Sequence, residues 1–364
     1  MQQIKVDGRR LIAFPNINNY NIAIRYLCEQ GLGASYLSMP PSTKETVELG
    51  SRYSPDYVCA PYKHTLGSLI EAANAGADTI IEVGGLCRLD YYGQPQKKVL
   101  SELGYDCEFI DLAFYMQAKK KKEWLKLAKH LSTNFNAAKA MTTLLEAVKM
   151  VEYLDEVEAY VNKNACFERD PGSFKREHKR FIRGMKSAES YGEIKSTYLS
   201  AMTAMEEIPL RENPDAIKIG IIGEYFTIMD PHSNLHIEDK LIAQNCSVSR
   251  FLNITNCHIK TRETSLRPKI KEYASFNMGA TNTWTINAAL DYAGRGYDGI
   301  VHVKSFGCTP ETDAIPVLQN ISADYRVPML FLSYDTQTSD TGLDTRIEAF
   351  CDMLKRKKRC CTKQ

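Results

Sequence analysis

Two segments of this 364-residue chain repeat each other, and this repeat constrains the fold more than any other feature. Residues 76–83 read GADTIIEV, and residues 296–303 read GYDGIVHV. Each segment follows an alanine-rich helical pattern that ends in glycine, so each predicts a helix leading into a buried β-strand. A chain that contains this unit twice is expected to hold two similar halves.

Short apolar strands alternate with helical patterns around both copies of the repeat. We predict strands at residues 11–14, 34–37, 79–83, 107–111, 217–222, 248–252, 300–303 and 329–333. A further extended segment, Tyr57 to Cys59, is predicted to end at Pro61, before a helix over residues 66–75. Strands that alternate with helices of this length indicate parallel sheets covered on both faces.

The middle of the chain lacks strand signals. From Met116 to about Glu207 the residues are mainly Lys, Glu, Ala, Met and Leu with helical periodicity. The chain is also longer than the roughly 250–300 residues that one hydrophobic core usually organises. We therefore predict an α/β protein with two similar doubly wound parallel-sheet domains, residues 1–115 and 209–364, and a helical segment, residues 116–208, between them.

Charge and cysteine usage limit the classes of protein to which the chain can belong. A formal net charge of +2 gives no global attraction to nucleic acid or to a membrane surface, and neither is expected as a partner. The N-terminal residues lack the apolar stretch of a signal peptide, and no apolar run approaches the roughly 20 residues that span a bilayer. The eleven cysteines are therefore expected to be thiols in the cytoplasm.

Three cysteines lie where the two halves are expected to bind ligands. Cys87 lies eleven residues after Gly76, and Cys308 lies twelve residues after Gly296, each in a glycine-containing loop after a strand. Ligands of open α/β sheets bind beyond the carboxyl ends of the strands, so both thiols are expected to face functional edges. Cys59 lies seventeen residues before Gly76, but the same offset from Gly296 falls on Gly279.

These three thiols have a functional and a structural interpretation. Three thiolates leave one coordination position open on a tetrahedral zinc ion or on a [4Fe–4S] cluster, which suits catalysis. However, a cysteine at a strand end is more often a small buried packing residue. The packing interpretation is preferred for the cysteines within helical or strand patterns: Cys28, Cys107, Cys166, Cys246, Cys257 and Cys351.

Other chemistries have little support in the sequence. The chain contains no phosphate-binding P-loop, no dinucleotide-binding G-x-G-x-x-G motif after a strand, and no H-E-x-x-H motif. His64, near Cys59, could pair with a thiolate, but the preferred interpretation is a solvent-facing helix residue. Glu224, which follows the first strand of the second half, either lies near the ligand cleft or caps a helix.

Several motifs resemble the 2-hydroxyacyl-CoA dehydratase components and their relatives, the acyl-CoA dehydratase activase-related and double-cubane cluster proteins. The resemblance covers most of both α/β halves. It is carried by Phe14-Pro15 through Asn19-Tyr20, Glu48-Leu49-Gly50-Ser51, Cys59-Ala60-Pro61-Tyr62-Lys63, Gly84-Gly85-Leu86-Cys87-Arg88, Tyr91-Tyr92-Gly93, Gly223-Glu224 and Gly307-Cys308-Thr309-Pro310-Glu311.

The resemblance implies a cofactor, a partner and a set of ligands. It implies that Cys59, Cys87 and Cys308 ligate a [4Fe–4S] cluster, alone or as part of a double-cubane cluster, in an anaerobic cell. It implies an ATP-hydrolysing activator of the actin and sugar-kinase superfamily that delivers low-potential electrons, and either a related second subunit or a homodimer. The activity would be that of a lyase acting on a 2-hydroxyacyl-CoA or of an ATP-dependent reductase component.

Two alternatives to that activity stay open. The chain could be a non-enzymatic electron-transfer or cluster-carrier subunit with the same ligands. It could also be a metal-free interaction module in which the thiols only pack.

Overall fold

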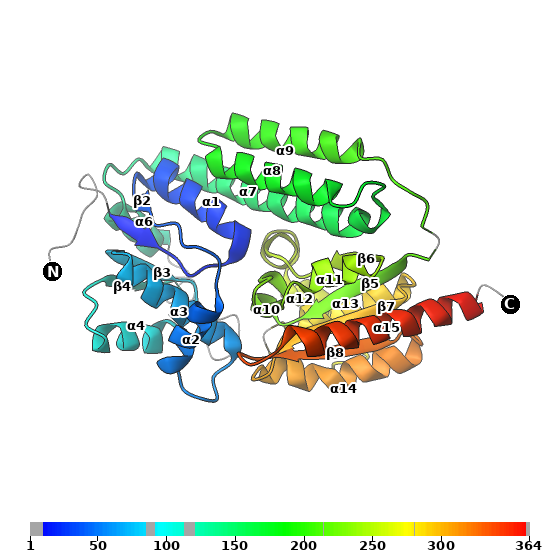
Figure 1. Ribbon diagram of the computed structural model, residues 1–364. Helices are drawn as coiled ribbons and strands as arrows, with labels where there is room; N and C mark the ends of the chain where they lie inside the picture. The colour runs from blue at the N-terminus through cyan, green and yellow to red at the C-terminus, as the bar shows by residue number, and fades with distance from the viewer. Residues whose placement is uncertain (1–9, 85–91, 113–120, 214, 280, 362–364) are drawn as a thin grey trace. The chain divides into compact units, whose positions relative to one another are not determined.

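The computed structural model of the chain describes residues 10–84, 92–112, 121–213, 215–279 and 281–361. Over these ranges the protein is α/β and contains two four-stranded sheets, each with all its strands parallel (Figure 1). The chain divides into two compact units: unit 1 comprises Met1–Val151 and Met185–Ile194, and unit 2 comprises Glu152–Gly184 and Lys195–Gln364. Helices of the predicted middle segment contribute to both units, and its boundaries at 115 and 208 stay predictions.

Unit 1 is built on a sheet with the strand order β2-β1-β3-β4. Its strands are β1 (Leu11–Ala13), β2 (Ser35–Tyr36), β3 (Thr79–Glu82) and β4 (Glu108–Asp111). The helices along this part of the chain are η1 (Asn18–Tyr20), α1 (Asn21–Tyr26), η2 (Leu27–Leu32), α2 (Lys44–Arg52), α3 (Ala60–Asn74), α4 (Gly93–Glu102) and α6 (Lys121–Leu131).

Neighbouring residues of the central strands pack into two separate cores in unit 1. Ile12 and Ile81 belong to a core that includes residues of η2 and α6. Ala13 and Ile80 belong to a second core with Leu66 and other residues of α3 and α4. Successive side chains of a strand point to opposite faces, so helices cover this sheet on both sides.

The described part of the middle segment is mainly helical. After α6 come α7 (Ala137–Asn164), the short η3 (Ala165–Phe167), α8 (Ser173–Ser187) and α9 (Tyr191–Glu206). Within unit 2, the rings of Tyr153 on α7 and Tyr198 on α9 stack with centroids 4.0 Å apart. The helical periodicity therefore predicted the type of element correctly.

Unit 2 is built on a sheet with the strand order β6-β5-β7-β8. Its strands are β5 (Ile217–Gly223), β6 (Cys246–Arg250), β7 (Gly299–Ser305) and β8 (Met329–Tyr334). The helices that follow α9 are α10 (Tyr225–Met229), α11 (Ile237–Ala243), η4 (Thr255–Lys260), α12 (Glu263–Ile270), α13 (Asn282–Gly294), α14 (Thr309–Asp324) and α15 (Asp340–Cys361).

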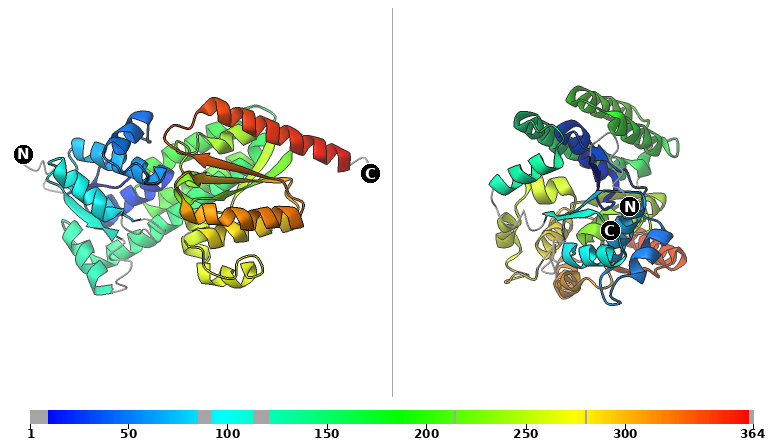
Figure 2. Two further views of the ribbon diagram at one scale, coloured as in Figure 1. Left: turned by 90° about the horizontal axis from the view of Figure 1, so that it is seen from below. Right: turned by 90° about the vertical axis from the view of Figure 1, so that its left-hand side faces the viewer.

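Two glycines identify which helices cover each face of this second sheet. A Cβ atom on Gly220 of β5 would meet the ring of Tyr292 on α13, whereas one on Gly299 of β7 would meet Leu354 and Phe350 on α15. Gly220 pairs with Ile300, the neighbour of Gly299, so the two glycines lie on opposite faces. Helix α13 thus covers one face and α15 the other, and α14 and α15 lie on opposite sides of β8 (Figure 2).

The sequence repeat has the same local structure in both units. Gly76 and Gly296 follow α3 and α13 with left-handed φ angles of +91° and +69°, which glycine adopts at helix ends without strain. Asp78 then accepts a hydrogen bond from the backbone N–H of Leu11 at 2.8 Å, and Asp298 accepts one from Lys218 at the same distance. Each aspartate ties the start of a central strand to its neighbour.

Both sheets follow the same strand order, counted from the first strand of each. In each sheet the second strand pairs on one side of the first strand and the third strand pairs on the other side, so the strand order changes direction between the first and third strands. In open α/β sheets ligands bind in the crevice at this point, which is flanked by β1 and β3 in unit 1 and by β5 and β7 in unit 2. The loops after these strands include the segments that carry Cys87, Glu224 and Cys308. As a separate point, none of the helices in the described part of the chain combines the length and the apolar character that a membrane-spanning helix needs.

The prediction for residues 57–61 was wrong. Residues 57–59 form no strand, and α3 begins at Ala60, six residues earlier than predicted, with Pro61 in its first turn. Proline is well tolerated there because the first N–H groups of a helix have no intrahelical partner. Pro61 therefore helps to start the helix and does not end a strand.

Helices α2 and α3 approach closely because glycines face each other. A Cβ atom on Gly67 of α3 would lie 1.9 Å from the carbonyl oxygen of Thr46, and one on Gly50 of α2 would lie 1.8 Å from that of Lys63. Both contacts are with backbone, which cannot move aside as a side chain can. The motif residue Gly50 therefore has a packing role.

We predict that Gly67→Ala destabilises the protein by about 1–3 kcal/mol, because the added methyl group must push α2 and α3 apart. Gly294→Ala on α13 is the matched control, since a Cβ atom there meets no atom within 4 Å. The control should be neutral or more stable by up to about 1 kcal/mol, as expected when alanine replaces glycine in a helix. Urea denaturation of both variants measures the difference, and equal midpoints would contradict the close approach.

Candidate functional site

Cys59 lies at the N-cap of α3 with an extended backbone (φ −66°, ψ 155°). Its side chain is half-buried, and its Sγ atom contacts the hydroxyl of Tyr92, the residue before α4. The Tyr92 ring in turn meets the Tyr62 ring edge-on, with centroids 5.1 Å apart. The thiol therefore lies at the start of a 15-residue helix, next to the beginning of α4.

Cys308 also lies at the N-cap of a helix, although its helix follows the central strand β7 of unit 2, whereas α3 precedes β3 in unit 1. It is the N-cap of the 16-residue helix α14, is half-buried, and has a proline, Pro310, in the first helical turn. Both cysteines thus belong to a Cys-x-Pro sequence that opens a helix: Cys59-Ala60-Pro61 and Cys308-Thr309-Pro310. The amino end of a helix carries partial positive charge, so the position of both thiols favours their deprotonated, anionic form.

The third predicted ligand, Cys87, lies in the loop 85–91, outside the described residues. The loop that carries it follows β3, and the loop that carries Cys308 follows β7, the strand at the same place in the second sheet. Gly279, the predicted counterpart of Cys59, has a left-handed φ of +99° and lies three residues before α13 begins. The N-cap of α13 is Thr281.

The other described cysteines, apart from the exposed Cys360 near the C-terminus, are mostly buried, as the packing interpretation predicted. The buried ones are Cys28, Cys166, Cys246, Cys257 and Cys351, whereas Cys107 is half-buried. Burial raises the pKa of Cys28 and Cys257 to about 12, which keeps them protonated. Among the described residues, no cluster of three or more His, Cys, Asp or Glu side chains is arranged to hold a metal ion.

A buried polar centre lies beside Cys308 in unit 2. Its central group is Glu311, which belongs to the first turn of α14 and is fully buried. One carboxylate oxygen accepts hydrogen bonds from Thr281 and Thr285, the latter at 3.0 Å. The other oxygen lies 2.8 Å from Nε2 of His302, which is also fully buried. Such a carboxylate can hold an imidazole in a fixed orientation or exchange a proton with it.

Lys304 adds a buried cation to the same end of β7. Its side chain is only 5% exposed, and its Nζ donates long hydrogen bonds to the carbonyl oxygens of Ser305 (3.4 Å) and Phe306 (3.3 Å). Burial lowers the pKa of Lys304, while the Cys308 thiol and the Glu311 carboxylate act in the opposite direction. The candidate ligand Cys308 therefore has a cationic side chain in its surroundings.

Glu224 caps a helix, as one of its two interpretations predicted. Its carboxylate accepts hydrogen bonds from the N–H groups of Phe226 (2.7 Å) and Thr227 (2.8 Å) at the start of α10. Burial nevertheless raises the pKa of Glu224, and the nearby Glu311 contributes in the same direction. This carboxylate therefore serves the crevice of unit 2 by holding the chain that leaves β5.

Unit 1 has a buried acid at the repeat position that His302 occupies in unit 2. Glu82 is the last residue of β3 and is only 3% exposed. Burial raises its pKa to about 8, although a hydrogen bond from the N–H of Gly84 opposes this shift. The carboxyl atom Oε2 of Glu82 has no hydrogen-bond partner in the structure. Burial thus favours the neutral, protonated form of Glu82.

Tyr62 lies near Glu82 and also has a buried hydroxyl without a hydrogen-bond partner. Burial, with the nearby Glu82 as a second cause, raises the pKa of Tyr62 to about 12. His64, one turn along α3, is 7% exposed, so the prediction that it faces solvent was wrong. The beginning of α3 therefore presents tyrosine, histidine and cysteine side chains to the interior of unit 1.

The sequence contained a signal for some residues that were overlooked. Glu82 and His302 occupy matched places in the repeat, which marks both as candidates. Thr65 and Thr285 are also matched, counting from Gly76 and Gly296, and each bonds to the helix that follows the central strand: Thr65 to Gln96 at 2.8 Å and Thr285 to Glu311. The importance of Glu311 depended on contacts between separate elements, which no local pattern indicates.

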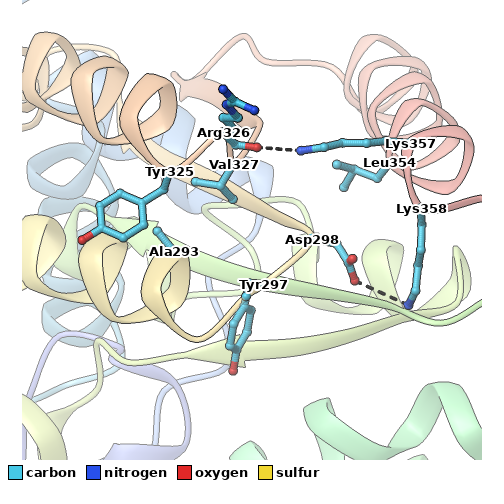
Figure 3. Close-up of a pocket in the computed structure, with 10 residues that line it drawn as sticks. Ala293, Tyr297, Asp298, Tyr325, Arg326, Val327, Leu354, Lys357 and Lys358 are labelled. Atoms are coloured by element: carbon cyan, nitrogen blue, oxygen red, sulfur yellow. Dashed lines mark hydrogen bonds and ion pairs between the residues drawn. The ribbon is translucent and has the colours of Figure 1, made fainter. Parts of the chain in front are cut away.

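A cavity of about 370 Å³ opens at the opposite edge of the second sheet, near the amino ends of β7 and β8 (Figure 3). Cations from α15 line it, but they are already engaged. Lys357 donates to the carbonyl oxygen of Arg326 at 2.6 Å, and Lys358 lies 3.7 Å from Asp298. This cavity is therefore a weaker candidate than the edge that carries Cys308.

Comparison with known proteins adds no family to this description. A scan of protein families finds none that matches the chain, and a search of curated proteins finds no match.

We predict that Glu82 makes stability depend on pH. Its pKa rises from about 4.5 in the unfolded chain to about 8 in the folded protein, so its contribution is complete below about pH 4.5 and is lost as the pH rises toward 8. The unfolding free energy should fall by up to about 1.4 kcal/mol per pH unit in this range.

Glu82→Gln should remove this contribution, because an amide does not titrate. The matched control is Glu48→Gln, which changes an exposed glutamate of α2. Denaturation midpoints measured between about pH 5 and 8.5 should decline less steeply for Glu82→Gln than for the wild type and the control. Parallel profiles for all three proteins would show that Glu82 is not a buried acid.

Proposed function

We propose that this protein binds an iron–sulfur cluster through Cys59, Cys87 and Cys308 and uses low-potential electrons from a partner ATPase. The reaction would be the reductive or dehydrating conversion of an acyl-CoA or small molecule, as in the 2-hydroxyacyl-CoA dehydratase components that the sequence resembles. The cluster would be of the [4Fe–4S] type, alone or in a double-cubane cluster, in an anaerobic cytoplasm.

One observation carries this proposal: the two described candidate ligands are N-caps of α3 and α14, each followed by proline in the first helical turn. Both thiols are half-buried, unlike the five buried cysteines of the packing class. Cluster ligands must be deprotonated, and the amino end of a helix favours negative charge. The chemistry of the donors therefore fits a thiolate-ligated, anionic cofactor.

The bound cluster would supply single electrons, and the protein would supply proton carriers and charge. Glu82 holds a proton at the end of β3, and the His302–Glu311 pair occupies the same region of β7. A buried carboxylic acid and an imidazole that is hydrogen-bonded to a carboxylate are groups suited to proton transfer. Lys304 contributes a positive charge near Cys308, which offsets negative charge on that thiolate.

We also propose that the two units are copies of one doubly wound α/β domain. The shared strand order, the matched Asp78 and Asp298 hydrogen bonds and the matched positions of Thr65 and Thr285 support this relationship. Loss of one thiol from the second copy, where Gly279 stands, would leave three ligands in the chain. A related subunit or a second copy of the chain would then complete a larger site.

The alternative from another class is a non-enzymatic electron-transfer or cluster-carrier subunit. The same ligands support it, and the polar groups near Cys308 would then adjust the potential of the cluster through charge and hydrogen bonding. Turnover distinguishes the two: an enzyme should convert an acyl-CoA when the activating ATPase is supplied, and a carrier should only pass electrons to a second protein.

Anaerobic reconstitution with iron and sulfide tests the proposal. The wild type should bind both, with the broad visible absorbance of a [4Fe–4S] cluster. Cys59→Ser and Cys308→Ser should each lose most of the bound iron and absorbance, because serine does not replace a thiolate ligand well. Cys107→Ser is the matched control, since Cys107 is half-buried like the two candidates but lies outside the site.

The control should bind as much iron as the wild type. Absence of iron from a folded wild-type protein would support a metal-free interaction module. Equal losses in Cys107→Ser and Cys308→Ser would show that the assigned cysteines are not special. Circular dichroism of each variant separates loss of ligand from loss of fold.

A further inference from the structure

Two cysteines outside the proposed cluster site are in direct sulfur–sulfur contact. Cys246 is the first residue of β6, an edge strand of the second sheet, and Cys351 lies in the middle of α15. Their Sγ atoms are 3.6 Å apart, and both residues are fully buried. They are 105 positions apart in the sequence, so the contact depends on the folded structure of unit 2.

The sheet geometry explains why these two thiols meet. Cys246 pairs in register with Ile217 of β5, so the two side chains point to the same face of the sheet. Ile219 and Ile221 also point to this face. Gly220, on the other face, contacts α13. Cys246 therefore points to the face that α15 covers, and the contact joins the edge of the sheet to its C-terminal helix.

The surroundings of the pair favour reaction between them. A hydrogen bond from Cys246 lowers the pKa of Cys351, and the positive charge of Lys355, one helical turn further along α15, acts in the same direction. The hydrogen bond to Cys351 and burial raise the pKa of Cys246. One sulfur is thus favoured as the thiolate and the other as the thiol, which is the arrangement that thiol oxidation requires.

We propose that Cys246 and Cys351 form a redox-sensitive dithiol that peroxide converts to a disulfide, fastening α15 to β6. The two S–H bonds break, one S–S bond forms, and one hydrogen peroxide molecule is reduced to two water molecules. A disulfide needs sulfurs about 2.0 Å apart, so the two atoms must approach by about 1.6 Å. Side-chain rotation with a small shift of α15 can supply this movement.

The bond would lie just before the last turns of α15, which have polar attachments: Lys358 and Arg359 pair with Asp298 and Asp215. Beyond Cys351, α15 supplies Leu354 and, one turn later, Lys357 and Lys358 to the wall of the cavity in Figure 3. A disulfide here would close a loop of about a hundred residues, a size for which restriction of the unfolded chain gives a large stabilisation. Oxidation should therefore hold the helix and this cavity in place. This inference does not depend on the proposed cluster.

Peptide mapping of the full-length protein tests the proposal directly. The protein is treated with hydrogen peroxide, denatured, alkylated and digested with trypsin. Cys246 then lies in the peptide Leu241–Arg250 and Cys351 in Ile347–Lys355, each with one cysteine. We expect a disulfide-linked pair of these peptides that a reductant separates. Cys360, which is exposed, reports that the peroxide has reacted with an accessible thiol.

Two results would overturn the proposal. One is complete alkylation of Cys246 and Cys351 under conditions that oxidise Cys360. The other is a link from Cys246 to Cys166, a buried thiol close enough to affect the pKa of Cys246. Because the wild type is used, neither result depends on whether a variant folds.

Thermal unfolding tests the fastening role. The oxidised wild type should melt a few degrees above the reduced protein. Cys351→Ser should lose this difference, whereas Cys257→Ser, which removes another buried thiol of unit 2, should keep it. Equal melting temperatures for the linked and reduced wild type would show that the disulfide does not fasten α15.

Discussion

Parallel pairing of the third strand with the first in each sheet is the constraint on which the candidate site depends. Pairing of β3 with β1 and of β7 with β5 brings the carboxyl ends of these adjacent strands to one edge of each sheet. From the first and third strands of each sheet, the chain continues in opposite directions across that sheet. The aspartates Asp78 and Asp298 fix the start of each central strand. The carboxyl ends of the central strands therefore carry polar groups at comparable places in the two units, Glu82 on β3 and His302 on β7.

The buried polar groups at these strand ends cost free energy unless they are paired, neutral or used. Glu311 is paired with two threonines and His302, whereas Glu82 avoids the cost by staying protonated. Lys304 is buried with only two long hydrogen bonds to carbonyl oxygens. Buried polar groups at the carboxyl end of the central strand in each of the two sheets are more typical of functional sites than of a packed core.

Much of the fold followed from patterns that are local in the sequence. The strand β5 of unit 2 was predicted well, as Ile217–Ile222 against the observed Ile217–Gly223, because it is rich in isoleucine, whereas β6, predicted at 248–252, lies at Cys246–Arg250. The repeat predicted that Gly76 and Gly296 end helices, and both do. The beginning of α3 was missed because proline was taken to stop an element, although it is also favoured in a first helical turn.

The side-chain partnerships were harder to predict, for a physical reason. His302 and Glu311 lie on β7 and α14, and Cys246 and Cys351 lie on β6 and α15; each contact exists only when these elements pack. His64 was misjudged because its burial depends on the core under α3 rather than on its sequence neighbours. Residue type and spacing identify candidates, but packing decides which of them meet.

We propose that the half-buried thiols at the helix starts hold an iron–sulfur cluster. Mössbauer spectroscopy of protein reconstituted anaerobically with the Mössbauer-active isotope of iron tests it most directly, because it reports the number and environment of the iron sites. We expect the spectrum of a [4Fe–4S] cluster, which Cys308→Ser removes. A spectrum of isolated iron bound by oxygen or nitrogen ligands, or one unchanged in Cys308→Ser, would contradict it.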